Sequence, residues 1–211
     1  MLRARSQPLK FRVSVLVPCD AKHVRHLSDL IAAYEAQTVR PDEIVVAGPS
    51  GLVGSAAVRI PVQYAPGSGA AGANRNRAAA VAKGDVFLYQ DADDLPHPRR
   101  VEIVKALFER YELDHLVHDF FRDLADLRRD RRLDDALARV NYWAKHAQLS
   151  RITNGNIATS RGVFAVVRWD ERPTRREDTD YNVTAIARFP KTSALLRMGL
   201  LQYRQNLSSA R

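Results

Sequence analysis

Hydrophobic residues in the first half of the chain gather in short runs separated by stretches of mixed polarity. Four of these runs are rich in β-branched and aliphatic residues, at residues 11–18, 43–47, 60–64 and 86–89. Continuous apolar runs of this length are typical of strands that are covered on both faces, as in parallel sheets. We therefore predict a strand at each of the four positions.

The segments between these runs have the periodicity of helices. Leu27, Ile31 and Tyr34 recur on one helix face, and residues 101–111 repeat the pattern. An alanine-rich stretch that ends at Gly84 predicts a further helix. Strands and helices that alternate with short connections form βαβ units, in which the strands are parallel.

The fold class follows from this alternation. We predict an α/β protein with a Rossmann-like, doubly wound, mostly parallel sheet. No internal repeat or low-complexity linker marks a boundary, so residues 1–211 are expected to form a single domain. Ligands of such sheets bind beyond the carboxyl ends of the strands.

The second half of the chain has a less regular pattern. Residues 113–121 are compatible with a strand, and residues 133–143 have the spacing of an amphipathic helix. Residues 154–168 are expected to form a loop followed by a strand.

Composition limits the class of protein. A chain of 211 residues with 45% apolar content can bury one substantial core. No stretch approaches the roughly 18–20 apolar residues of a membrane helix, and the basic residues 1–12 lack the apolar segment of a signal peptide. The single cysteine, Cys19, excludes an internal disulfide and a multi-cysteine zinc site, which favours a reducing, cytoplasmic setting.

The net charge favours anionic partners. The chain carries 33 Lys and Arg against 24 Asp and Glu, a formal charge of +9. The densest basic tract, residues 122–139, mixes six arginines with five aspartates, which is typical of a solvated, salt-bridged helix face. We therefore expect no nucleic-acid partner.

The strongest candidate for chemistry is an acid cluster at the end of the fourth predicted strand. Asp91, Asp93 and Asp94 follow the apolar run directly, with only Ala92 between them. Several carboxylates at one strand end repel one another, and a bound cation relieves this repulsion. The alternative is a polar turn, since Asp is common in turns and Pro96 follows closely.

A glycine-rich loop at residues 67–72 precedes a helix whose first turns carry Arg75 and Asn76. Small residues allow a close approach of the backbone, and helix N-terminal amides with a guanidinium suit a diphosphate. The loop matches neither a Walker motif nor a dinucleotide-binding fingerprint.

A second group of acids lies near the C-terminal end, at Glu177 and Asp178. A carboxylate beside an acceptor hydroxyl can act as a general base. The same residues can equally cap the helix that begins there, without a chemical role.

Taken together, these segments resemble family 2 glycosyltransferases of the GT-A fold. The matching stretches occur in the same order as in the family, and they are residues 13–20, 36–46, 73–85, 88–94, 176–181 and 203–209. The resemblance spans nearly the whole chain except residues 120–150. It implies a nucleotide-sugar-binding half at about residues 1–112 and an acceptor-side half at about residues 113–211.

The resemblance also implies an activity and site residues. The expected reaction is an inverting, metal-dependent transfer of a sugar from a nucleotide diphosphate sugar to an acceptor hydroxyl. Asp91 and Asp93 lie on the family's DxD motif, so Asp93 would bind Mn²⁺ or Mg²⁺ and Asp91 would hold the ribose or share the ion. Asp178 would be the catalytic base, and Glu177 would orient it or bind the acceptor.

The remaining donor contacts are also taken from the resemblance. They would be made by the first strand's exit, the second strand's exit, the basic helix start and the DxD motif. These candidates are Pro18, Cys19, Asp20, Ser50, Arg75, Asn76, Asp91, Ala92 and Asp93.

Two positions depart from the family pattern. Relatives commonly end the second strand with paired aspartates, whereas this chain has Ala47 and Gly48 and leaves Ser50 as the nearest polar group. Relatives often carry a histidine between the YR element and NLS, whereas here only Gln205 separates Arg204 from Asn206. The donor base is therefore left open.

Two other functions remain alternatives. A catalytically inactive glycosyltransferase-like binding module would keep the fold and lose metal-dependent nucleotide binding. A sugar nucleotidyltransferase would normally carry a glycine-rich, basic signature after the first strand, which residues 18–21 lack. The acceptor is expected to be a glycan, a lipid-linked molecule or a small molecule, and the basic charge is compatible with peripheral contact at the inner face of an anionic membrane.

Overall fold

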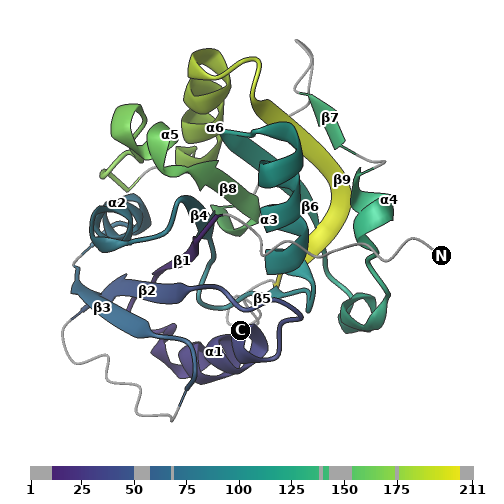
Figure 1. Cartoon of the computed structure of the whole chain (residues 1–211). Helices are drawn as coiled ribbons and strands as arrows, with labels where there is room; N and C mark the ends of the chain where they lie inside the picture. The colour runs from purple at the N-terminus through teal and green to yellow at the C-terminus, as the bar shows by residue number, and fades with distance from the viewer. Residues whose placement is uncertain are drawn as a thin grey trace.

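The computed structural model describes residues 11–49, 58–67, 69–137, 140–142, 154–173 and 176–204. Within these ranges the chain forms one mixed sheet with helices on both faces (Figure 1). The strands are β1 Val13–Pro18, β2 Glu43–Gly48, β3 Val62–Pro66, β4 Val86–Tyr89, β5 Leu95–Pro96, β6 His115–Phe121, β7 Val140–Tyr142, β8 Ile157–Ser160 and β9 Ser193–Gln202. The α-helices are α1 Leu27–Glu35, α2 Ala71–Val81, α3 Arg100–Tyr111, α4 Leu133–Leu137, α5 Arg161–Val166 and α6 Glu177–Arg188.

The strand order is β3-β2-β1-β4-β8-β6-β9-β5, and β7 also pairs with β9. Strands β3, β2, β1 and β4 are parallel, as the βαβ pattern predicts. Strand β8 runs antiparallel to both β4 and β6, and β6 and β9 are parallel to each other. The parallel half delivers the exits of β1, β2 and β4 to one edge of the sheet.

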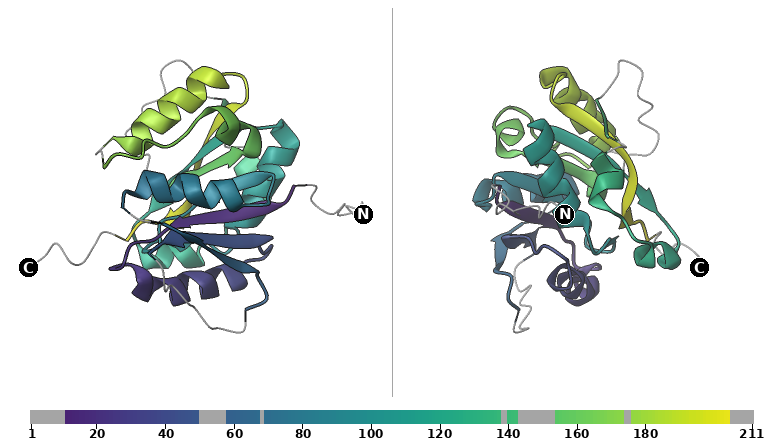
Figure 2. Two further views of the ribbon diagram at one scale, coloured as in Figure 1. Left: turned by 90° about the vertical axis from the view of Figure 1, so that its left-hand side faces the viewer. Right: turned by 45° about the vertical axis from the view of Figure 1, so that its right-hand side comes forward.

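Two hydrophobic cores cover the two faces of this sheet. One core joins alternate residues of β1 and β2 to the apolar faces of α1 and α3, with Leu30 and Leu107 fully buried. The other core lies under α2, α5 and α6 and contains Leu16, Phe87 and Trp169. Figure 2 shows α1 and α2 on opposite sides of strands β1–β3. Period-two alternation sends neighbouring residues of each strand into different cores, which explains the continuous apolar runs.

The predicted α/β class and the strands and helices of the first half are confirmed. The expected helix at residues 133–143 is wrong in its second part, because α4 ends at Leu137 and residues 140–142 form β7. Pairing of β7 with β9 supplies non-local hydrogen bonds that a helix-period pattern cannot indicate.

The expected strand within residues 154–168 ends earlier than predicted. Strand β8 stops at Ser160 and α5 begins at Arg161. The Arg161 side chain donates to the carbonyls of Ala82 and Gly84, just after α2. These bonds anchor the first residue of α5 beside the end of α2, where β8 has stopped. Strand β9, the longest in the described chain, had no predicted counterpart.

None of the helices in the described part of the chain combines the length and the apolar character of a bilayer-spanning segment. Its longest α-helices, α3 and α6, have 12 residues each.

Candidate active site

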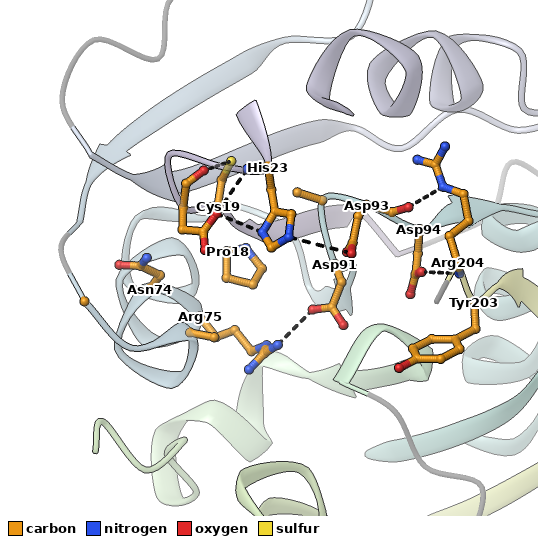
Figure 3. A pocket seen from close by; sticks show the side chains of 14 residues that line it. Pro18, Cys19, His23, Asn74, Arg75, Asp91, Asp93, Asp94, Tyr203 and Arg204 are labelled. Atoms are coloured by element: carbon orange, nitrogen blue, oxygen red, sulfur yellow. Dashed lines mark hydrogen bonds and ion pairs between the residues drawn. The ribbon is translucent and has the colours of Figure 1, made fainter. Parts of the chain in front are cut away.

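A cavity of about 280 Å³ opens at the carboxyl ends of β1 and β4. Its walls come from four parts of the chain: the β1 exit, the start of α2, the turn after β4 and the end of β9 (Figure 3). The lining residues are Pro18, Cys19, Asp20, His23, Gly69, Ala71, Asn74, Arg75, Asp91, Ala92, Asp93, Asp94, Tyr203 and Arg204. The position agrees with the rule for ligands of parallel sheets.

The floor of the cavity is the acid turn, residues 91–94. Gln90, which is fully buried, donates from Nε2 to the carbonyl oxygens of Asp91 at 2.8 Å and Asp94 at 3.1 Å. These two bonds hold the backbone of the turn at both ends. Gly155 packs against the turn, since a Cβ there would lie 3.2 Å from the Asp91 amide nitrogen.

Gln90 is held in turn by a buried cation. The Arg100 guanidinium donates to the side-chain oxygen of Gln90 and to the hydroxyl of Tyr34, and its side chain is completely buried. Burial lowers the pKa of Arg100, while nearby Tyr34, Asp94 and Asp91 act in the opposite direction. The acid turn is therefore supported from behind by a fixed positive charge.

Asp94 is the least solvated carboxyl group of the turn, with 1% exposure. One oxygen, Oδ1, accepts the Arg204 amide at 2.8 Å, and Oδ2 has no hydrogen-bond partner within the described residues. Burial, together with the charges of Asp91 and Asp93, raises the pKa of Asp94 to about 8. The like-charge repulsion expected from the sequence is therefore present in the fold.

Arg75 connects the acid turn to the second group of acids. Its Nη2 donates to Asp91 Oδ1 at 2.8 Å and its Nη1 donates to Glu177 Oε1 at 2.8 Å. The guanidinium carbon lies 4.6 Å from the centre of the Trp169 ring, which stacks on Tyr181 with a centroid separation of 4.1 Å. Arg75 is 1% exposed, so both charge-assisted bonds are largely shielded from water.

The neighbouring Asn76 does not reach the cavity. Its amide is occupied by the backbone of Trp169, donating to the carbonyl at 2.9 Å and accepting the N–H at 3.0 Å, and it also donates to Glu171. It fastens α2 to the segment before α6. The asparagine of this helix that lines the cavity is Asn74.

The backbone of α2 approaches the same segment closely. A Cβ on Gly72 would collide with the Asp170 carbonyl oxygen, so only glycine permits this contact. The start of α2 has no side-chain cap at Ala70. Ala71, the first residue of this helix, lines the cavity, so the positive end of the helix dipole faces it.

The β1 exit forms the opposite wall. Pro18, Cys19 and Asp20, which the sequence suggested as donor contacts, all line the cavity. Burial, aided by Asp20 and Asp93, raises the pKa of the Cys19 thiol to about 11, which disfavours the reactive thiolate near neutral pH. The predicted contact Ser50 lies outside the described residues.

Glu177 and Asp178 begin helix α6. Glu177 joins the site through Arg75, and neither acid is among the residues that line the cavity. Asp178 Oδ1 accepts the Thr179 amide at 2.7 Å. The structure thus links Glu177 to the acid turn through one guanidinium, and Asp178 is the next residue of the helix.

The donor set fits a hard divalent cation that is shared with a ligand. Asp91, Asp93 and Asp94 offer carboxylate oxygens, and one of these oxygens is buried without a partner in the described chain. In the described ranges no group of three or more His, Cys, Asp or Glu side chains is arranged to hold a metal. A cation here would therefore need phosphate oxygens to complete its coordination, as Mg²⁺ and Mn²⁺ sites with nucleotides commonly do.

Several residues of the cavity were not singled out from the sequence. His23 lies between Asp20 and Asp93, and Arg204 contacts Asp94 through its amide and the Asp93 carbonyl through its side chain. Tyr203 completes this wall. Tyr203 and Arg204 belong to the segment 203–209 that resembles the family, so the sequence contained a signal for them. No sequence feature pointed to His23.

Three other histidines, His97, His115 and His118, are bonded within the protein scaffold. His97 Nε2 bonds the Arg129 carbonyl, His115 Nε2 bonds Asn182 Oδ1, and His118 Nε2 accepts from Arg100. All three are at most 2% exposed, and none lines the cavity.

Comparison with known structures identifies the fold. The structure is similar to that of S. aureus TarS 1–349 in complex with UDP, with a TM-score of 0.71 and 15% identity over 91% of this chain and 60% of that chain. It is also similar to the mannosyltransferase PcManGT from Pyrobaculum calidifontis in complex with GDP-Man and Mn²⁺, with a TM-score of 0.59 and 19% identity, covering 90% of this chain and 55% of that one.

A third similar structure is the glucosyl-3-phosphoglycerate synthase from Mycobacterium tuberculosis in complex with Mn²⁺, UDP and glucosyl-3-phosphoglycerate. The TM-score is 0.60 with 14% identity, and the match covers 99% of this chain and 80% of that one. The chain thus spans about 60% of the length of TarS 1–349. No curated protein sequence gave a significant match.

The family model for glycosyl transferase family 2 matches residues 61–170, which is more than half of the chain and includes the start of α2, the acid turn and Trp169. The similar structures are glycosyltransferases of the GT-A fold, in agreement with the sheet described above. The chain therefore belongs to glycosyl transferase family 2 and has the GT-A fold.

Proposed function

We propose that this glycosyltransferase moves a sugar from a nucleotide diphosphate sugar to an acceptor hydroxyl, with inversion and with the help of a divalent cation. The observation that carries the proposal is the meeting of the acid turn and the uncapped start of α2 across one cavity. Carboxylates on one side suit the cation, and helix amides on the other suit the diphosphate. Neither group alone would bind a nucleotide diphosphate well.

Asp93 is the proposed metal ligand, and Asp91 shares the ion or holds the ribose. When bound, Mn²⁺ or Mg²⁺ neutralises the diphosphate and stabilises the charge that develops on the leaving group. Ala92 lies between the two acids in the cavity lining. Gln90 and Arg100 hold the turn in place before the ligand binds. Less conformational entropy is therefore lost on binding.

The β1 exit and the start of α2 are proposed to hold the rest of the donor. Pro18, Cys19 and Asp20 would contact the nucleoside, with Ser50 added from the β2 exit. Asn74 takes the role first assigned to Asn76, because it is the asparagine in the lining. Arg75 is close enough to support the diphosphate, although both of its Nη atoms also bond carboxylates.

Asp178 is proposed as the base that removes the proton from the acceptor hydroxyl, and Glu177 as its partner at the acceptor side. The Arg75 bridge supports this arrangement, because it fixes Glu177 relative to the acid turn. In a single displacement the base and the leaving diphosphate act on opposite sides of the reacting carbon. The guanidinium holds Glu177 at one Nη and Asp91 at the other, and Asp178 follows Glu177 directly in α6.

The proposal assigns donor binding and acceptor binding to different halves of the chain. Residues 1–112 form the nucleotide-sugar-binding half, and residues 113–211 form the acceptor-side half of a single domain. UDP, UDP-GlcNAc and GDP-Man are bound in the structures of similar proteins. The donor base is left open, since Ala47 and Gly48 supply no acid at the β2 exit.

We also propose a cytoplasmic enzyme with peripheral contact to an anionic membrane, on the basis of its charge of +9.

The test is thermal stabilisation by a panel of nucleoside diphosphates and nucleotide sugars, with and without Mn²⁺. One base class should raise the melting temperature only when Mn²⁺ is present, since a ligand that binds the folded state stabilises it. Asp93→Asn should abolish this shift. Asp29→Asn serves as the control, because Asp29 is an exposed acid on α1 away from the cavity.

A donor that passes this screen is then used for turnover. Asp178→Asn should lose transfer and keep the Mn²⁺-dependent shift, because the base acts after donor binding. Full transfer activity in either Asp93→Asn or Asp178→Asn would contradict the assigned role. The absence of any Mn²⁺-dependent shift across the panel would reject the proposal as a whole.

A further inference from the structure

His23 lies in the cavity wall opposite the acid turn, at the N-cap of the short 3₁₀ segment Val24–His26 that follows the β1 exit. Its side chain keeps 24% exposure, so the ring borders both protein and the open cavity. Figure 3 shows one ring nitrogen of His23 turned toward Asp93, and the other ring nitrogen contacts Asp20. None of the roles proposed above uses this histidine.

The two ring nitrogens have different partners. Nδ1 lies 2.8 Å from Asp20 Oδ1, a hydrogen-bond distance. Nε2 lies 3.8 Å from Asp93 Oδ2, which is too long for a hydrogen bond. A carboxylate that accepts the Nδ1 proton fixes the tautomer and leaves the Nε2 lone pair facing the acid turn.

Asp20 is itself well held. Its Oδ1 also accepts the backbone amides of Lys22 at 3.0 Å and His23 at 3.1 Å. The carboxylate therefore sits in a fixed position and can orient the ring. A carboxylate bonded to one ring nitrogen is the arrangement commonly found when the other nitrogen of a histidine binds a metal.

We propose that His23 binds the divalent cation through Nε2 together with Asp93, and that Asp20 is the positioning residue for its ring. This inference rests on the proposed function, because the ion is the one expected with the donor. Bonds from a divalent transition metal to nitrogen and oxygen are about 2.0–2.2 Å long, so two atoms 3.8 Å apart can both reach one ion.

A second observation points to a cation in the same cavity. Asp94 is 1% exposed, lines the cavity, and keeps Oδ2 without a hydrogen-bond partner in the described part of the chain. A buried carboxylate oxygen without a partner is costly, and a nearby cation relieves that cost.

The proposal specifies a metal preference. Mg²⁺ strongly favours oxygen ligands, whereas imidazole nitrogen is a good ligand for transition metals and its contribution rises from Mn²⁺ to Co²⁺. His23 should therefore strengthen the binding of Mn²⁺ and Co²⁺ and leave Mg²⁺ binding nearly unchanged. A purely structural role for His23 would affect all three ions equally.

The experiment measures metal binding by the whole chain with UDP or GDP, at pH 8, where most free histidine is neutral. His23→Gln should weaken Mn²⁺ and Co²⁺ at least tenfold and change Mg²⁺ less than threefold. Asp20→Asn should weaken Mn²⁺ about tenfold, as is typical for loss of a histidine's supporting partner. His26→Gln is the matched control, since His26 is the next histidine along, with its ring centre 6.2 Å from that of His23, and it does not line the cavity.

A spectroscopic readout gives an independent answer. Pulsed electron paramagnetic resonance of the Mn²⁺–nucleotide complex should show coupling to a directly bound nitrogen in the wild type and in His26→Gln. The coupling should be absent in His23→Gln. Circular dichroism and melting temperature confirm that the variants are folded before they are compared.

The outcomes separate the two proposals. Mn²⁺-dependent nucleotide binding without nitrogen coupling, or an equal loss of all three ions in His23→Gln, would overturn the role of His23 and leave the proposed function intact. A wild-type chain that binds neither nucleotide with Mn²⁺ would overturn both. Weaker nucleotide binding with unchanged metal preference would reassign His23 to the diphosphate and overturn its role as a ligand.

Discussion

Replacing Arg75 by methionine tests whether the guanidinium bridge between the acid turn and α6 stabilises the fold. The substitution keeps a long apolar stem beside Trp169 and removes the charge. It leaves Asp91 and Glu177 without the partner that each now has at 2.8 Å. Two carboxylates would then face the space that the guanidinium vacates.

The expected cost follows from burial. Removing one partner of a buried ion pair typically costs about 3–5 kcal/mol, and the remaining exposure of Asp91 and Glu177, at 24% and 12%, favours the lower end. Loss of the stacking on Trp169 adds about 1 kcal/mol. We therefore expect Arg75→Met to lose about 3–4 kcal/mol of unfolding free energy.

The assay is urea unfolding of the chain without metal or nucleotide, followed by circular dichroism at pH 7.5. Arg172→Met is the matched control, because Arg172 forms an ion pair with Asp170 at 2.7 Å on a side chain that is 84% exposed. This control should unfold at the wild-type urea concentration. The double variant Arg75→Met with Glu177→Gln should lose less than the two single variants added together, since they share one contact.

One result would refute the reasoning. If Arg75→Met unfolds within 1 kcal/mol of both the wild type and Arg172→Met, the bridge contributes no more than an exposed pair. The two acid motifs would then not be coupled through Arg75 in the free protein.

Three further predictions follow from other parts of the structure. Burial lowers the pKa of His115 to about 4, so between pH 4 and 6.5 the unfolded state binds more protons than the folded state. The unfolding free energy should therefore fall by about 3 kcal/mol as the pH decreases through this window. Urea unfolding should show a smaller pH dependence for His115→Gln. Gly72→Ala should lose about 1–3 kcal/mol in the same assay, because its Cβ meets the Asp170 backbone, whereas Gly162→Ala in α5 has room and should not lose stability. Cys19, buried and with its pKa raised to about 11, should react with iodoacetamide at pH 8 only after unfolding, and rapid labelling of the native chain would contradict this.

The sequence was sufficient for the parallel half of the fold because its signals are local. Strands β1, β2 and β4 are apolar runs, and α3 has a clear helical period. Strand β9 depends on partners far along the chain, since it pairs with β5, β6 and β7. Such pairing leaves no mark in a short window of sequence, so β9 and β7 were not predicted.

The site shows the same limit at the level of single side chains. The sequence brought Arg75 and the acid turn together, because both follow from strand ends and a helix start. It selected Asn76 and not Asn74, although the two residues point about 160° apart around a helix. Only the packing of α2 against Trp169 determines which of them reaches the cavity.

The acid turn explains why distant parts of the chain must fold together before a donor can bind. Each of its carboxylates has a polar neighbour from a different segment: Arg75 beside Asp91, His23 beside Asp93, and the Arg204 amide on Asp94. These contacts hold the like charges within one cavity, and Asp94 Oδ2 remains without a partner in the described residues. A cation bound here would relieve the remaining repulsion between the carboxylates. It would thereby stabilise the three segments that surround the acid turn, namely α2, the β1 exit and the end of β9. Donor binding and the stability of these three segments should therefore be linked, which is the physical basis for using thermal stabilisation to find the donor.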